Sequence, residues 1–318
     1  MFRNILVPLD SSPLAEIVLP HTQAIAQVSN SKVNLLHVLE QLPGLRQQSG
    51  VDPFDWQILK AQAETYLSEV EARLEKSGLQ VNIDLAEGNA AESVIEYAHS
   101  HDIDLILLSS HGQSGISGWN VSSVVQKIIL RAYTSVMIMR AYQPGQGSSD
   151  KARYQRILAP LDGSQRAEVV LPVAAALARS QQACVILAHV VRRPEMPRRT
   201  PPSEEDLDLS NRITERNRQE AEAYLADLAH RLDVTVETRL LVSADVYGSL
   251  HNLAEQEGVD LVLLSAHGYT GGMQWPYGNV VVSFVAYGSS PLLIVQDLPR
   301  NSIQPTRAEL VAREQGVH

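Results

Sequence analysis

The chain has 318 residues, of which 44% are hydrophobic and 19% are charged, and its formal net charge at pH 7 is −10. This composition is typical of a globular protein, and the length favours two domains of ordinary size. The negative charge argues against nucleic acid or an anionic membrane as the main partner, because both require a basic surface. The sequence has no signal-peptide pattern and no long apolar stretch, and Cys184 is its only cysteine. We therefore expect a cytoplasmic protein with no membrane segment, no intrachain disulfide and no cysteine-based metal site.

Apolar runs of strand length alternate with helical patterns in the first half of the chain, which is typical of βαβ units in a parallel sheet. We expect strands at Asn4–Leu9, Lys32–Leu39, Val81–Ala86, Leu105–Ser109 and Val136–Met139. We expect helices at Ala15–Val28, Phe54–Lys76, Ala91–His101 and Val121–Arg131. The strands are continuous apolar runs, as expected when helices cover both faces of the sheet.

The second half of the chain repeats the first. Residues 4–12 read NILVPLDSS and residues 156–164 read RILAPLDGS, at an offset of 152 residues. Farther on, residues 104–112 (DLILLSSHG) match residues 260–268 (DLVLLSAHG) at an offset of 156. Matches in the same order at nearly constant offsets indicate two copies of one domain. The expected units are domains at 1–141 and 154–297, a Pro/Gly/Ser-rich linker at 142–153 and a polar tail at 298–318.

Polar residues follow the predicted strands at the same places in both copies. They are Asp10 and Asp162 after the first strand, His37-Val38 and His189-Val190 in the second, and SSHG (109–112) and SAHG (265–268) after the fourth. In an open parallel sheet, ligands bind at this edge. A carboxylate there can accept hydrogen bonds from ribose hydroxyls or an amino group, and a glycine-bearing loop before a helix offers N–H groups to an anion. The two aspartates have a second interpretation as N-caps of the first helix, with Ser12 and Ser164 as alternative caps.

Four kinds of segment recur in the two copies: VPLD and APLD in the first strands, LLHV and LAHV in the second, the S-x-H-G loops, and a terminal apolar strand. Together they resemble the universal stress protein family, here as a tandem of two domains. The resemblance covers about residues 2–140 and 153–296. It implies an α/β fold with two doubly wound parallel-sheet domains, Rossmann-like and similar to the adenine nucleotide alpha-hydrolases.

Members of this family that bind ATP carry a loop of the form G-x-x-G, nine residues, then G-S or G-T. The two copies keep this spacing as Ser109-x-x-Gly112 with Ser122-Ser123, and as Ser265-x-x-Gly268 with Gly278-Asn279. Glycine is lost at the leading position of both copies and at Ser122, and serine disfavours the positive φ that lets a backbone curl around phosphate. Neither nine-residue loop contains Lys or Arg. The spacing favours nucleotide binding, whereas the substitutions weaken the expected contacts with phosphate.

The ligand implied by the resemblance is ATP or AMP, with Mg²⁺ only if ATP is bound. In the first copy the resemblance implies that Asp10 contacts ribose or adenine, that the backbone of Val38 contacts adenine, and that Gly112, Ser122 and Ser123 contact the phosphates. In the second copy the corresponding residues are Asp162, Val190, and Gly268, Gly278 and Asn279. Because the second copy keeps Gly278, we expect it to hold phosphate slightly better than the first.

We expect a regulatory or protective stress-response protein that binds an adenine nucleotide without acting as an enzyme. One alternative is a nucleotide-free module of the same fold that binds other proteins, and another is a slow ATP hydrolase. His37, His111, His189 and His267 lie near the loops, and we expect them to hold the loops through backbone hydrogen bonds rather than to transfer protons. The sequence has no P-loop and no nucleophile in an elbow motif, and it predicts no catalytic residue.

The last strand of each copy is the expected contact between the copies. The family resemblance implies that single-domain members dimerise through this strand, here Val136–Met139 and Leu292–Val295. Such strands are exposed apolar edges unless they are paired. We therefore predict an intramolecular pseudo-dimer, which can associate again as a homodimer. The sequence does not identify protein partners, and we expect neither nucleic acid nor a membrane as one.

Overall fold

The computed structural model describes residues 1–40, 53–112, 121–141, 152–194, 201–269 and 277–298. The expected linker at 142–153 and tail at 298–318 therefore lie almost wholly outside the described residues. Among the described residues, no helix is both long enough and apolar enough to cross a membrane.

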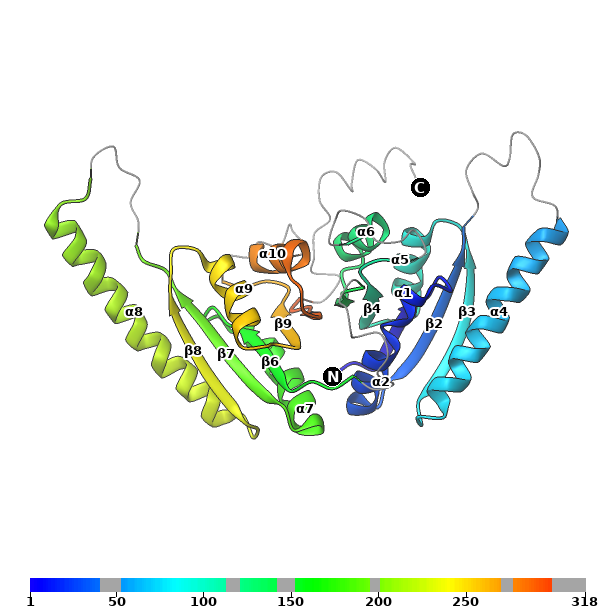
Figure 1. Ribbon diagram of the computed structural model, residues 1–318, viewed down its shortest axis with the longest axis horizontal. Helices are drawn as coiled ribbons and strands as arrows, with labels where there is room; N and C mark the ends of the chain where they lie inside the picture. The colour runs from blue at the N-terminus through cyan, green and yellow to red at the C-terminus, as the bar shows by residue number, and fades with distance from the viewer. Residues whose placement is uncertain (41–52, 113–120, 142–151, 195–200, 270–276, 299–318) are drawn as a thin grey trace.

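The two copies contain the same series of elements (Figure 1). The first copy contains β1 (Asn4–Pro8), α1 (Pro13–Glu16), α2 (Leu19–Ser29), β2 (Lys32–Leu39), α4 (Pro53–Glu75), β3 (Gln80–Glu87), α5 (Ala90–Ser100), β4 (Leu105–Ser109), α6 (Ser123–Arg131) and β5 (Ser135–Met139). The second contains β6 (Arg156–Pro160), the 3-10 helix η1 (Ala167–Val170), α7 (Leu171–Gln181), β7 (Cys184–Val191), α8 (Glu204–Arg231), β8 (Val236–Val242), α9 (Val246–Gln256), β9 (Leu261–Ser265), α10 (Asn279–Tyr287) and β10 (Leu292–Val295). All five strands predicted for the first copy are confirmed, each to within one residue at either end.

The prediction of one continuous helix at Ala15–Val28 is wrong. The chain forms α1 and α2 instead, with Ile17 and Val18 as turn residues between them. Pro20, in the first turn of α2, has no N–H to donate to the carbonyl of Glu16, and its ring crowds that carbonyl. The second copy has the same break between η1 and α7, with Pro172 in the first turn of α7.

The described strands form one ten-stranded sheet in the order β3-β2-β1-β4-β5-β10-β9-β6-β7-β8. Strands within each copy are parallel, whereas β5 and β10 pair antiparallel, with Met137 opposite Leu293. The predicted pairing of the last strands within one chain is thus confirmed. The long helices α4 and α8 lie at opposite ends of the molecule (Figure 1).

Helices cover both faces of this sheet, which confirms the doubly wound fold. Ile5 and Val7 belong to the core beneath α1, α2 and α4, whereas Leu6 belongs to the core beneath α5 and α6, because alternate strand residues point to opposite faces. Each core contains residues of both copies. The two halves are therefore packed as one body through the β5–β10 junction.

The aspartates that open the repeated DLxLLS segments have a structural role at the amino ends of the strands. Asp104 accepts hydrogen bonds from the N–H groups of Arg3 (2.8 Å) and Asn4 (3.2 Å). Asp260 accepts the N–H groups of Gln155 (2.6 Å) and Arg156 (3.2 Å). Each aspartate thus joins the fourth strand of its copy to the beginning of the first, at the edge opposite the predicted ligand site.

Candidate functional site

A cavity of about 820 Å³ opens at the carboxyl ends of β1, β2 and β4. Four of the residues predicted for the first copy, Asp10, Val38, Gly112 and Ser122, line it. Ser123, which begins α6, does not. Apolar side chains form much of the wall, among them Trp56, Leu59 and Ala63 of α4, Val94 of α5, and Val125 and Ile128 of α6. A cavity of this size with an apolar wall and a few polar groups is suited to a small organic ligand.

Asp10 and Asp162 close the turn after the first strand of each copy. The Ser12 N–H donates to Oδ1 of Asp10 at 3.0 Å. In the second copy both the N–H and the hydroxyl of Ser164 donate to Oδ1 of Asp162, at 3.0 and 2.6 Å. The cap of α1 is Ser12, whose Oγ accepts the Ala15 N–H at 3.1 Å. The interpretation of Asp10 as the N-cap is therefore wrong, and the serine alternative is confirmed.

The same two carboxylates contact the loop after the fourth strand. Oδ2 of Asp162 accepts the N–H of Tyr269 at 2.6 Å. A Cβ on Gly268 would stand 2.1 Å from this oxygen, and a Cβ on Gly112 would stand 2.1 Å from Oδ2 of Asp10. Only glycine permits so close an approach. Because a carboxylate has about four acceptor positions, these aspartates can join the two loops and still accept a hydrogen bond from a ligand.

Ser122 and Gly278 have the same backbone conformation although their side chains differ. Their φ and ψ angles are −68° and 162° for Ser122 and −73° and 163° for Gly278, an extended conformation that any residue adopts. A Cβ on Gly278 would come no closer than 3.6 Å to its neighbours. Because φ is negative at both positions, the argument that serine disfavours a positive φ does not apply at position 122.

The two positions differ instead in how they cap the following helix. Ser122 Oγ accepts the N–H of Val125 at 3.3 Å, so α6 is capped by its own chain. Gly278 provides no side-chain cap for α10. Because uncapped N–H groups at a helix start attract anions, the greater phosphate affinity expected of the second copy, which stays a prediction, would come from this difference in capping and not from φ.

His37 and His189 are half-buried at the ends of β2 and β7. Burial lowers the pKa of both side chains below the usual 6.5, although a backbone hydrogen bond at Leu9 or Leu161 and the charge of Asp10 or Asp162 act in the opposite direction. Both are therefore neutral at pH 7 and do not attract phosphate. The Nδ1 atoms of both rings are buried without a hydrogen-bond partner among the described residues, so the loop-holding role expected of these histidines stays a prediction.

His111 and His267 are buried beside the candidate loops but have different contacts. His111 Nδ1 lies 3.1 Å from Ser110 Oγ. His267 Nδ1 lies 2.6 Å from Oδ1 of Asp297, whose Oδ2 accepts Nε of Arg166 at 2.5 Å. Burial alone would raise the pKa of Asp297, but the hydrogen bonds from His267 and Arg166 hold it below its usual value. Neither Arg166 nor Asp297 was predicted from the sequence; a carboxylate two residues after the last strand is the signal that points to this pair.

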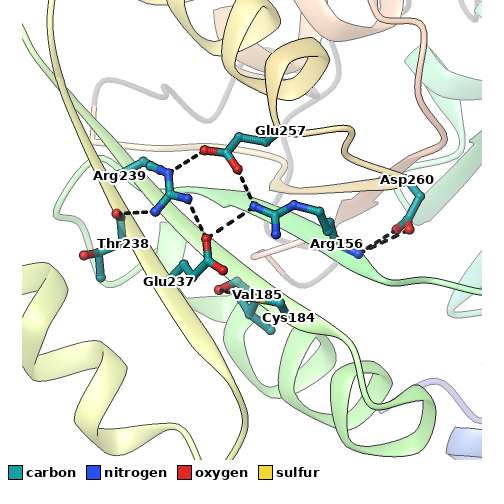
Figure 2. A network of polar contacts seen from close by, with 8 residues as sticks. All are labelled: Arg156, Cys184, Val185, Glu237, Thr238, Arg239, Glu257 and Asp260. Carbon is teal, nitrogen blue, oxygen red and sulfur yellow. Dashed lines mark hydrogen bonds and ion pairs between the residues drawn. The ribbon is translucent and has the colours of Figure 1, made fainter.

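A second polar cluster, also missed, lies at the amino ends of the second-copy strands (Figure 2). Arg156 contacts both Glu237 and Glu257, and Arg239 contacts the same two carboxylates at 2.5 and 2.6 Å. Cys184 lies beside this cluster, and burial followed by the charge of Glu237 raises the pKa of its thiol. The cluster lies at the edge of the sheet opposite the candidate site, and we assign it to stability.

Comparison with known proteins agrees with the repeat. The family model described as the universal stress protein family matches residues 1–140 and 153–296. The chain belongs to this family. The two matches are consistent with the tandem arrangement joined at β5 and β10.

Individual universal stress proteins match one copy or both. Universal stress protein MJ0577 of Methanocaldococcus jannaschii is 25% identical over 157 residues, which are 44% of this chain and 96% of that protein. The crystal structure of a universal stress protein from Archaeoglobus fulgidus matches with a TM-score of 0.61 and 16% identity, covering 93% of this chain and 98% of that one. A putative universal stress protein from Pseudomonas aeruginosa matches with a TM-score of 0.66 and 17% identity, covering 100% and 98%. At these identities the two structures show a shared fold.

Proposed function

We propose that this universal stress protein binds an adenine nucleotide, AMP or ATP, in the cavity of its first copy and acts as a regulatory or protective protein in the stress response. The observation that carries the proposal is the cavity at the carboxyl ends of β1, β2 and β4, which Asp10, Val38, Gly112 and Ser122 line together. These are residues that the family resemblance implies for the ligand. The cavity lies at the carboxyl ends of the strands, which is the edge of the sheet where α/β folds bind ligands.

In this proposal each part of the ligand meets a different element. The adenine ring lies against the apolar wall and the backbone of Val38, and the ribose hydroxyls donate to Asp10. The phosphates extend along Gly112 toward Ser122 and Ser123. The second copy offers the corresponding set of Asp162, Val190, Gly268, Gly278 and Asn279. No described side chain caps the start of α10, which supports phosphate binding there.

Mg²⁺ enters this proposal only together with ATP. Nowhere in the described part of the chain are three His, Cys, Asp or Glu side chains grouped so as to hold a metal ion. The donor set therefore fits a Mg²⁺ that phosphate oxygens and water hold, as is usual for this ion in nucleotide complexes.

Calorimetric titration of the intact chain with AMP and ATP tests the proposal, supported by native mass spectrometry of protein purified without added nucleotide. We expect saturable heat at protein concentrations of about 100 μM. Asp10→Asn keeps an acceptor for the Ser12 N–H but removes the charge, and Asp162→Asn does the same in the second copy. We expect the first variant to weaken binding about tenfold and the second to leave the first cavity unchanged. The absence of heat with every adenine compound would instead favour the nucleotide-free interaction module.

Turnover is measured in the same samples. We expect bound ATP to remain intact, with no phosphate release above buffer. Phosphate release that Asp10→Asn or Asp162→Asn abolishes would support the slow ATP hydrolase in place of the binding protein.

A further inference from the structure

We infer that the first cavity selects the uncharged nucleoside, adenosine, over its triphosphate. This inference rests on the proposed function and narrows the ligand class of the same site. It is argued from the charges that line the cavity, from the N-termini of the two helices that border it, and from its apolar wall.

The charged side chains that line the cavity are acidic. Among the described lining residues they are Asp10 and Glu40, and none of those residues is Lys or Arg. Lys60 of α4 and Lys127 of α6 belong to elements that form the wall, but neither lines the cavity. His37, which does line it, is neutral at pH 7 because burial lowers its pKa. Each phosphate added to a ligand therefore brings negative charge toward these carboxylates, and no lysine or arginine among the lining residues that the structure describes balances it.

Backbone N–H groups at a helix start often replace such cations, because they attract phosphate. Besides the short α1, the helices α5 and α6 begin at this cavity, and protein oxygen atoms already occupy N–H groups of both. At the start of α5 the Ala90 N–H donates to Glu40 Oε1 at 3.0 Å, and the Glu92 N–H donates to Asn89 Oδ1 at 3.3 Å. At the start of α6, Ser122 Oγ accepts from Val125. A phosphate would compete with these oxygen atoms for the N–H groups that they occupy, and at α5 it would also meet the Glu40 carboxylate.

The remaining wall suits an uncharged aromatic ring. Trp56 and Leu59 of α4 lie on one side, and Val94 of α5 and Val124 and Ile128 of α6 also line the cavity. A purine ring buries its faces against such side chains and gains from stacking on an indole. The cavity therefore favours the base and the ribose, and it opposes the triphosphate through like-charge repulsion.

The test measures the dissociation constants of adenosine, AMP and ATP for the intact chain at about pH 8, where ordinary histidines are neutral, without divalent metal. Tryptophan fluorescence follows binding, and the part of the signal that Trp56→Phe abolishes reports the first cavity. We expect adenosine to bind about tenfold more tightly than ATP, with AMP between them. Raising the salt from about 0.05 M to about 0.5 M should tighten ATP binding and leave adenosine unchanged, because salt screens repulsion.

A matched pair of variants separates charge from structure. Glu40→Gln keeps an acceptor for the Ala90 N–H but removes the charge, and we expect it to tighten ATP binding about threefold without changing adenosine. Glu96→Gln makes the same charge change at an exposed position of α5 outside the lining, and we expect it to change neither. ATP binding that is tighter than adenosine binding, or that salt weakens, overturns the inference and leaves the proposed function standing. Failure of all three compounds to bind overturns the proposed function itself.

Discussion

The Oδ2 atom of Asp10 lies where the side chain of any residue but glycine at position 112 would begin, 2.1 Å from the Cβ position. Asp162 and Gly268 have the same relationship in the second copy. The turn after the first strand and the loop after the fourth therefore fit together through a carboxylate packed against a glycine. This packing explains why Asp and Gly recur together in the two copies, whether or not a ligand is present.

Gly112→Ala is expected to displace the Asp10 carboxylate and to separate the two loops. The free energy of unfolding should fall by about 2–3 kcal/mol, and adenine-compound binding at the first cavity should weaken at least about tenfold. Urea unfolding and the titrations described above measure the two effects. Gly278→Ala is the matched control, since its Cβ would meet ordinary contacts of 3.6 Å or more. Similar losses in the two variants would contradict the packing argument.

The sequence was sufficient for the elements and the duplication but not for the contacts that join the loops. Strands such as Lys32–Leu39 are mainly apolar, as expected of strands in a sheet that is covered on both faces, so the sequence predicted their bounds to within one residue. The effect of Ser122 was misjudged because φ at that position depends on the three-dimensional path of the loop. The contact of Asp297 with His267 joins positions 30 residues apart, and no local pattern encodes such a distance. The break before α2 was readable from Pro20 and was overlooked.

Ser11→Gly is expected to stabilise the protein. Ser11 lies directly after Asp10 with φ +62°, whereas its counterpart in the second copy is Gly163 with φ +84°. A residue with a Cβ pays about 1 kcal/mol or more in this left-handed region, and glycine does not. We expect a gain of up to about 1 kcal/mol in the free energy of unfolding, measured by urea denaturation. Gly163→Ser is the reciprocal variant and should lose a similar amount; a gain there would count against backbone strain as the cause.

Arg140→Met is expected to weaken the junction between the two copies. Arg140 is only 2% exposed and donates from one copy to carbonyl groups of the other, to Phe284 at 2.6 Å and to Val285 at 3.3 Å. These carbonyls end α10, where a cation is favourable. The Phe284 carbonyl keeps a hydrogen bond from the Gly288 N–H at 2.9 Å, so removing the arginine should cost about 1–3 kcal/mol. Arg131→Met, which removes an exposed ion pair with Glu92, should cost at most about 1 kcal/mol. If urea unfolding shows that the two variants lose equal stability, the contact of Arg140 across the junction is not the cause of the loss.

Glu237→Gln is expected to make Cys184 more reactive. Burial first, and then the Glu237 carboxylate, raise the pKa of the thiol, and the thiolate is the reactive form. Removing the carboxylate lowers that pKa, so alkylation by iodoacetamide at about pH 8 should accelerate about threefold. Glu257→Gln breaks the same ion-pair cluster (Figure 2) at a carboxylate that is not among the causes of the raised thiol pKa. If Glu257→Gln accelerates alkylation as much as Glu237→Gln does, the reactivity of the thiol depends on loosening of the cluster and not on the charge of Glu237.

Acid is expected to destabilise the protein partly through His21. Its Nδ1 lies 2.7 Å from the hydroxyl of Tyr154, so that the pair joins α2 of the first copy to the segment before β6. Burial lowers the pKa of His21 from 6.5 to about 4. Between these values the unfolded chain binds a proton that the folded chain excludes, so stability falls as the pH drops from about 6.5 toward 4 and is unaffected above about pH 7. The shift corresponds to a loss of up to about 3 kcal/mol.

Urea midpoints at about pH 7.5 and pH 5 measure this dependence. His21→Asn keeps a hydrogen-bonding partner for Tyr154 but cannot titrate, so the variant should lose less stability between the two pH values than the unmodified chain. Some loss should persist, because burial also lowers the pKa values of His37, His189 and His251. His230→Asn, at an exposed position near the end of α8, should keep the full dependence. If His21→Asn keeps it too, proton uptake on unfolding occurs at the other histidines, and the contact between α2 and Tyr154 does not sense pH.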